Sequence, residues 1–350
     1  MLRYLARRFI WAVVLFIAVT LVAYVLFFLI PNDPARLVAG KAATDADVKR
    51  AAHFLGTDRP FYVQYGKFLD RLVVHQNLGF SFANRQSVNS IVGNAAPVTA
   101  SLVFGGAIFW MLLALPIGIL SALRPRSLLD RASMTFVLIG ISAHPIWIGL
   151  IFAYFFGFRL HLTPITGYCD FINPSTECGG PVQWAYHLVL PWATFAILFA
   201  ALYVRMIRAN VLDTMNEDYV RTARAKGAPE HLVLRSHILR NALLPVVTML
   251  GMDLGYWIGN AVFVESIYGL PGVGRMLVRG LTQRDLPVVM GVIVFVSVVI
   301  VLLNLIIDLL YAAIDPRVRI ERTEREGEPL AAHRREQPVV SSAEQPAASV

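Results

Sequence analysis

The side chains best placed for chemistry form a basic segment between two apolar stretches. From Arg221 to Arg240 it holds five lysines and arginines and a single acidic residue, Glu230. Gly227 suits the left-handed position that ends a helix, and Pro229 suits the first position of the next one. The segment therefore predicts two short helices joined at the glycine. Such a segment could dock on a partner protein or lie on anionic lipid, and both interpretations remain open.

The first of these predicted helices has a face of small residues. Tyr219, Ala223 and Gly227 recur at four-residue spacing, so they share one face. Because two of them are small, a partner could approach this face closely. The cations expected on its flanks are Arg221, Arg224 and Lys226.

Two cysteines lie together in one polar stretch, "YCDFINPSTECGG". A disulfide between Cys169 and Cys178 is predicted if this loop lies outside the cytoplasm, and two free thiols are the alternative. No Cys/His spacing resembles a zinc site, so no metal site is predicted. The sequence also has no G-x-x-x-x-G-K-[ST] phosphate loop and no nucleophile–base arrangement at a membrane face. An enzyme, and an ATPase in particular, is therefore not expected.

The composition indicates which solvent surrounds these residues. The chain of 350 residues is 57% hydrophobic and 15% charged, with a mean hydropathy of +0.60, whereas soluble domains carry about 25% charged residues. The net charge of +8 resides mainly in short segments beside apolar stretches, as orientation signals do. Because basic and aromatic residues are not interleaved, nucleic-acid binding is not expected. The composition predicts a membrane protein.

Apolar stretches long enough to cross a bilayer divide the chain. A span needs about 20 predominantly apolar residues. Six segments qualify: Phe9–Ile30, Val98–Leu123, Ser133–Gly157, Trp184–Met206, Ala242–Ile267 and Val288–Ala313. The first resembles a signal peptide, but its apolar run is too long and no cleavage site follows, so we expect a retained helix. His144 and Pro145 predict a kink inside the third segment. The fold class predicted is an all-α membrane protein with six transmembrane helices.

Lysines and arginines in the short loops predict the orientation. Basic residues cluster before the first span, in "RPRSLLDR", in the segment 221–240 and in "DPRVRIERTER". All four lie on one side, so the N- and C-termini are predicted to be cytoplasmic. The cysteine loop then lies outside with Arg159 as its only cation, although "GLPGVGRMLVRGLTQRD" places three arginines on that side too.

The expected organisation follows from these spans. Residues 1–30 hold the first helix, 31–97 an extracytoplasmic cap with short helical pieces, and 98–315 a five-helix core with a cytoplasmic loop at 209–241. Residues 316–350 are charged, rich in Pro, Ser and Ala and aperiodic, so a disordered cytoplasmic tail is predicted.

Several ordered motifs resemble the permeases of ABC importers. "TARAKG" followed at fixed spacing by "ILRNALLP" is similar to their cytoplasmic loop, with Ala223, Gly227 and the Leu243–Leu244–Pro245 end matching. Arg221 and Thr222 stand where the family usually has an acidic residue, a form that resembles the dipeptide/oligopeptide branch. "YLARRFIWAVVLFIAVTLVAYVLFFLIPNDPA", "LGTDRPFYVQYGKFLDRLVVHQNLGFSF" and "YAAIDPRVRI" resemble other parts of that branch, so the likeness extends to residue 320.

The resemblance implies a type I ABC importer permease fold in the cell membrane. It implies a coupling helix that docks on a cytoplasmic ATPase, formed by Asp218, Tyr219, Arg221, Thr222, Ala223, Arg224, Ala225, Lys226, Gly227, Ala228 and Pro229. Two ATPase subunits, a second homologous permease chain and an extracytoplasmic substrate-binding protein are the implied partners besides lipid. ATP and Mg would be bound by the ATPases, and no cofactor is expected in this chain. Dipeptides or oligopeptides are the implied cargo. Nickel or another small solute remains an alternative, and a stand-alone secondary transporter is a further one.

Polar residues in the fifth apolar segment are candidates for the translocation pathway. Ionisable groups within membrane helices are functional-site hypotheses by default. Asp253, Asn260 and Glu265 follow one another along this segment, and we predict that they line the pathway. Asp253 could equally pair with a neighbouring helix, and Glu265, near the outer end, could be solvated.

Overall fold

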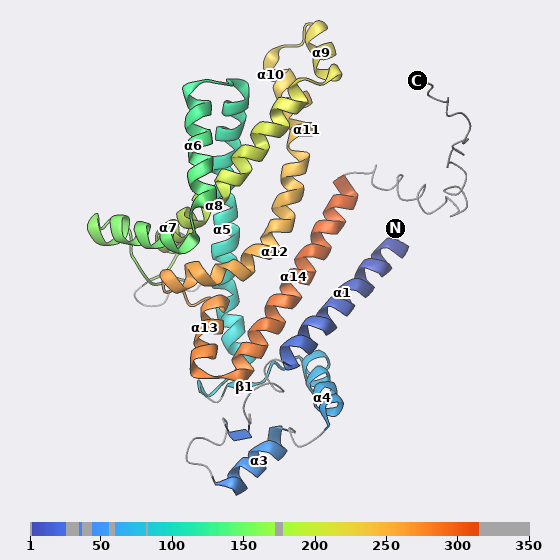
Figure 1. The fold of residues 1–350 in the computed structure, drawn as a ribbon, viewed down its shortest axis with the longest axis vertical. Helices are drawn as coiled ribbons and strands as arrows, with labels where there is room; N and C mark the ends of the chain where they lie inside the picture. Colours follow the sequence, from blue (N-terminus) through green and yellow to red (C-terminus); the bar gives the residue numbers. More distant parts are fainter. Residues whose placement is uncertain are drawn as a thin grey trace, which may run out of the picture. The chain divides into compact units, whose positions relative to one another are not determined.

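The computed structural model describes residues 2–25, 35–36, 44–55, 60–81, 83–171 and 178–314 (Figure 1). The chain divides into two compact units, residues 1–305 and 306–350. The described part of the second unit is the helical end of α14. The helices before residue 160 are α1 Leu2–Tyr24, α3 Asp45–Leu55, α4 Phe61–Val73, α5 Val88–Leu123, α6 Leu128–Ser142, α7 Pro145–Phe152 and the π-helix η2 Ala153–Arg159.

The second half of the described chain is helical as well. Its elements are α8 Pro181–Met215, α9 Asp218–Ala225, α10 Glu230–Leu232, the π-helix η3 Val233–Leu239, α11 Arg240–Ala242, α12 Leu244–Ile267, α13 Val273–Gln283 and α14 Leu286–Ile314. One short antiparallel hairpin joins β1 Phe80–Ser81 to β2 Gln86–Ser87, with Phe80 opposite Ser87.

Four described helices are long and apolar enough to cross a membrane. They are α5, α8, α12 and α14 up to Ile307. The pair of α6 with α7–η2 makes a fifth if it is counted as one bent span. The apolar part of α1, Phe9–Tyr24, is shorter than a full span, and residues 26–30 of the first expected span lie outside the described residues. So does the expected tail, residues 316–350.

The third expected span, Ser133–Gly157, is not a single straight helix. Its two halves meet at 107° between Ser142 and Pro145. Because proline pushes the preceding residue out of the helical region, His144 is extended, with φ −90° and ψ 141°. Its Nδ1 then accepts a hydrogen bond from the Ile146 N–H at 3.3 Å. The predicted kink is present, but it is a sharp break at which α7 begins anew.

The helix that contains the second expected span begins ten residues before Val98. Helix α5 starts at Val88, where the Ser87 hydroxyl accepts a hydrogen bond from the Ser90 N–H. Pro97, which was the expected end of the cap, lies inside this helix. The described part of the cap is therefore α3, α4 and the β1–β2 hairpin. An aromatic face of α4 with Phe61, Tyr65 and Phe68 packs on Tyr24 of α1.

The main core lies where α5, α8 and α12 pack together. Trp110 of α5 and Trp257 of α12 are fully buried, and their rings lie 4.4 Å apart. Small residues let the helices approach closely. A Cβ at Gly118 would lie 2.9 Å from Ile207 Cβ, and one at Gly140 2.6 Å from Ala201 Cβ.

Candidate functional site

The basic segment folds as two helical pieces around a tight turn, as the sequence predicts. Helix α9 ends at Ala225, and Gly227 has φ +79°, a left-handed value that suits glycine. The Gly227 N–H donates to the Arg224 carbonyl at 2.9 Å, and the Ala228 N–H donates to the Ala223 carbonyl at 3.2 Å. Pro229 lies one residue before α10 as its N-cap, and Glu230 opens the helix. These bonds satisfy the carbonyls at the end of α9.

An ion pair closes this turn from one helix to the other. Arg224 donates to Glu230 through Nη2 at 2.6 Å and through Nε at 3.2 Å. The hydrogen bonds from Arg224 hold the pKa of the Glu230 carboxyl below its ordinary value. Because both side chains are solvent-exposed, salt screens this pair. It orients the turn more than it stabilises it.

Of the three residues of the face that the sequence predicts, Tyr219 and Gly227 are exposed and Ala223 is half-buried. Val220 is fully buried in the main core with Val233 and Ile238 of η3, and Ala223 packs against the same cluster. Ala223 is therefore partly covered by its own chain. The outward side chains of the segment are Asp218, Tyr219, Arg221, Thr222, Arg224, Ala225, Lys226 and Pro229, with Gly227 also exposed. This face is polar and basic.

Hydrogen bonds join the residues that flank the basic segment to one another. Asn241 Nδ2 donates to the Tyr219 hydroxyl at 2.9 Å, and Asn210 Nδ2 donates to the Ala242 carbonyl at 3.3 Å. The segment also follows α8 after two residues and leads into α12 through Leu243. Helix α9 is therefore connected to both long helices by short stretches of chain.

An ion pair with a buried carboxylate was not anticipated from the sequence. Asp130 of α6 accepts hydrogen bonds from Arg208 of α8, through Nε at 2.6 Å and Nη2 at 3.0 Å. The Ser121 hydroxyl and the Arg126 N–H also donate to this carboxylate. The S-x-x-D pattern that begins at Ser127 signals a helix start. Nothing in the sequence signals a partner 78 residues away.

The three expected pathway residues have different surroundings. Asp253 is half-buried and accepts a hydrogen bond from the Tyr203 hydroxyl of α8 at 2.6 Å, which matches the helix-pairing alternative. Asn260 is half-buried, and its amide donates to the Tyr256 carbonyl of its own helix. Glu265 is fully buried. Its carboxylate is enclosed by protein, so neither solvation nor a place in the pathway wall fits this residue.

Glu265 instead fastens the start of α13. Its Oε1 accepts from the Thr99 hydroxyl at 2.6 Å, and Oε2 accepts from the Arg275 N–H at 2.9 Å. Thr99 Oγ1 in turn accepts from the Val273 N–H at 2.8 Å. Gly272, the N-cap of α13, has no side chain to cap the helix. Helix α13 also has no acidic residue in its first turn. The absence of a local cap could have indicated that its first N–H groups need an acceptor from elsewhere in the chain.

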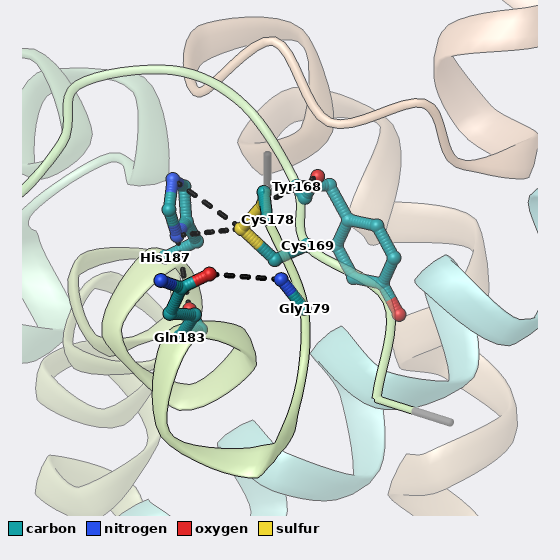
Figure 2. The surroundings of a disulfide bond; sticks show 6 residues. All are labelled: Tyr168, Cys169, Cys178, Gly179, Gln183 and His187. Carbon is teal, nitrogen blue, oxygen red and sulfur yellow. Dashed lines mark hydrogen bonds between the residues drawn. A yellow bond between two sulfur atoms is a disulfide. The ribbon is translucent and has the colours of Figure 1, made fainter. Parts of the chain in front are cut away.

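The two cysteine sulfurs are joined in a disulfide that closes the polar loop (Figure 2). Cys169 is buried, and its sulfur lies 3.2 Å from His187 Nδ1. The Gly179 N–H donates to Gln183 Oε1 at 2.8 Å, and the Gly180 N–H donates to the Asp170 carbonyl at 3.1 Å. Cys169, Cys178 and His187 are near enough to hold a metal ion, but the disulfide occupies both sulfurs.

Sequence comparisons cover nearly the whole chain. Residues 114–320 match the family described as binding-protein-dependent transport system inner membrane component, and residues 1–103 match its N-terminal family. A putative peptide permease of Brucella suis is 36% identical over 91% of this chain and 100% of its own length. A di/tripeptide transport system permease of Pseudomonas aeruginosa is 36% identical over 92% of this chain and 100% of its own length. A probable D,D-dipeptide transport system permease of Escherichia coli is 37% identical over 89% and 96%.

Solved structures share the fold over a smaller part of the chain. An amino acid ABC transporter matches with a TM-score of 0.50 and 14% identity, over 64% of this chain and 94% of its own. The inward-facing methionine transporter MetNI matches with a TM-score of 0.51 and 18% identity, over 64% of this chain and 96% of its own. On the family match and the full-length relatives, this multi-pass membrane chain belongs to the family of binding-protein-dependent transport system inner membrane components.

Proposed function

We propose that this chain is the permease subunit of an ATP-driven importer of dipeptides or oligopeptides in the cell membrane. The cargo rests on the relatives, which are named as peptide, di/tripeptide and D,D-dipeptide permeases and align from end to end. The proposal includes six spans and cytoplasmic termini. Basic residues concentrated beside α5–α6, in the basic segment and at both chain ends support this orientation.

The observation that carries the proposal is the build of the basic segment. Its inner side packs in the core through Val233 and Ile238, while its outer side presents Arg221, Ala225 and Lys226 to solvent. Coupling between two sites requires an element that both of them bias. Because α9 lies between α8 and α12, a cytoplasmic ATPase docked on its exposed face could move both helices.

The remaining parts of the importer are proposed on the same grounds. ATP and Mg would be bound by two ATPase subunits, a second homologous permease chain would complete the pathway, and a substrate-binding protein would deliver peptide to the outer face. Within this chain, Asp253 and Asn260 remain the candidates for contact with cargo. Both are only half-buried, so a solute beside α12 could reach them.

Purification from the native membrane tests the assembly. The tagged chain is isolated in mild detergent, co-purified proteins are identified by mass spectrometry, and the complex is reconstituted in liposomes. We expect a second permease and ATPases to co-purify, and labelled alanyl-alanine to enter the liposomes only with ATP and the binding protein. A chain that purifies alone and moves solute without ATP would instead be a stand-alone transporter, and the proposal would be wrong.

A further inference from the structure

A cavity of about 600 Å³ opens between the start of α5, the helix α13 and the disulfide loop. It lies far from the basic segment, because the 24 residues of α12 separate the two, a length of about 36 Å. With the orientation proposed above, the cavity faces the outside of the cell. Its volume is within the range of about 300–1,000 Å³ typical of small-molecule sites.

The lining of this cavity is apolar at its base and polar at its rim. Val98 of α5 and Val288 of α14 are buried residues of the base. The amides of Asn94 and Gln283 are exposed at the rim, and Tyr168 adds a half-buried ring. Half of the fourteen lining residues are polar or charged, so the cavity suits a polar ligand that also carries apolar groups.

Two opposite charges line the same cavity, and neither has a partner within the described chain. Asp170 and Arg279 are both exposed, and neither side chain forms an ion pair or a hydrogen bond among the described residues. The side of the cavity formed by α13 is therefore positive, and the side formed by the disulfide loop carries the carboxylate.

Both charges are carried on fixed backbone. Asp170 follows the buried Cys169 of the disulfide, and its carbonyl accepts a hydrogen bond from the Gly180 N–H. Arg279 lies on α13, whose start is held by Glu265 and Thr99. The backbone at both positions is therefore ordered before a ligand binds, and the cost of binding falls on the exposed side chains.

We propose that this cavity is a peptide-binding site on the outer face of the permease, in which Arg279 binds the terminal carboxylate of a short peptide and Asp170 binds its terminal ammonium. Asn94 and Gln283 are placed to bond the peptide amide, and the apolar base accommodates a side chain. The inference rests on the proposed peptide cargo and adds a site in this chain where the peptide binds.

Binding of three related ligands to the full chain in lipid nanodiscs tests the site. The ligands are alanyl-alanine, its N-acetyl derivative without the ammonium, and its C-terminal amide without the carboxylate, each titrated by saturation-transfer NMR. Arg279→Gln should weaken the binding of alanyl-alanine about tenfold, because one hydrogen bond between charged groups is lost. It should leave the affinity for the C-terminal amide unchanged. Asp170→Asn should weaken the binding of alanyl-alanine to a similar extent and leave the affinity for the N-acetyl peptide unchanged.

The control is Arg284→Gln, because Arg284 is an exposed arginine at the end of α13 that does not line the cavity. It should bind alanyl-alanine like the unmodified chain. Absence of binding to the unmodified chain, or equal affinities in all variants, overturns the site. So does a loss in Arg279→Gln that is the same for the amide as for alanyl-alanine.

Transport by the reconstituted complex separates this inference from the proposed function. If the unmodified complex does not import alanyl-alanine with ATP, the peptide cargo is wrong, whatever the binding data show. If it imports the peptide and both charge variants have an unchanged KM, the cargo stands and the site is wrong. The expected result is import with a raised KM in Arg279→Gln and Asp170→Asn.

Discussion

Gly227 is the residue on which the geometry of the basic segment depends most directly. We expect Gly227→Leu to leave membrane insertion intact but to reduce ATP-dependent import strongly. Its left-handed φ of +79° costs an ordinary residue about 1–2 kcal/mol, and a Cβ there would meet nothing within 4 Å. The cost is therefore conformational and falls on the turn. Import into proteoliposomes, with ATPase co-purification, measures the effect.

The matched variant is Gly227→Asn, because asparagine tolerates the left-handed region better than other non-glycine residues. It should retain most of the import. If both variants import at the rate of the unmodified complex, the turn does not transmit motion and the coupling role of this segment is wrong.

Glu265 should matter for stability more than for transport specificity. We expect Glu265→Ala to destabilise the protein by about 3 kcal/mol or more, because two hydrogen bonds to a buried carboxylate are lost, each contributing about 1.5–3 kcal/mol. Thermal unfolding in detergent, followed by tryptophan fluorescence, measures the loss. Thr99→Val should also lower the unfolding temperature, whereas Thr99→Ser keeps the hydroxyl and should lower it less. Equal effects of the two Thr99 variants would contradict this network.

At the scale of elements, the two faces of α9 predict different outcomes for similar substitutions. Ala223 packs on the main core and Ala225 is exposed. Ala223→Trp should therefore lower the unfolding temperature of the chain itself. Ala225→Trp should leave the unfolding temperature unchanged and reduce ATPase co-purification. Normal ATPase recovery with Ala225→Trp would show that the docking surface lies elsewhere.

The disulfide loop is the element whose order the cavity needs. Replacing both cysteines, Cys169→Ser with Cys178→Ser, frees the backbone that carries Asp170. We expect weaker binding of alanyl-alanine in the double variant, and the same loss when the unmodified chain is treated with a membrane-permeant reductant. An unchanged affinity in both cases would mean that the disulfide does not hold the carboxylate in place.

The sequence predicted the structural features that depend on single residues or on short stretches of composition. The Gly227 turn and the break at Pro145 follow from backbone restrictions of single residues, and the long apolar helices follow from composition. The contacts of Asp130 with Arg208 and of Glu265 with Thr99 could not be predicted, because they join residues far apart in the sequence. Ala223 shows the same limit, since four-residue spacing defines a face but does not say that the core partly covers one of its residues.

At the scale of the whole molecule, every proposal depends on which side of the membrane each end of α12 faces. Its first turn follows the basic segment, and its last turn precedes α13 and the cavity. If the segment binds an ATPase and the cavity binds external peptide, the two ends must face opposite sides. Two exposed positions report this directly: Lys226 in the basic segment and Arg284 at the end of α13.

We expect Arg284→Cys to react with a membrane-impermeant maleimide on intact cells, and Lys226→Cys to react only after the membrane is permeabilised. The chain without an added cysteine is the control, because Cys169 and Cys178 are joined and should label only after reduction. The reverse pattern would place the basic segment outside, where ATP is absent, and would make ATPase docking untenable. Labelling of both positions on intact cells would put them on one side, which a single crossing by α12 does not allow.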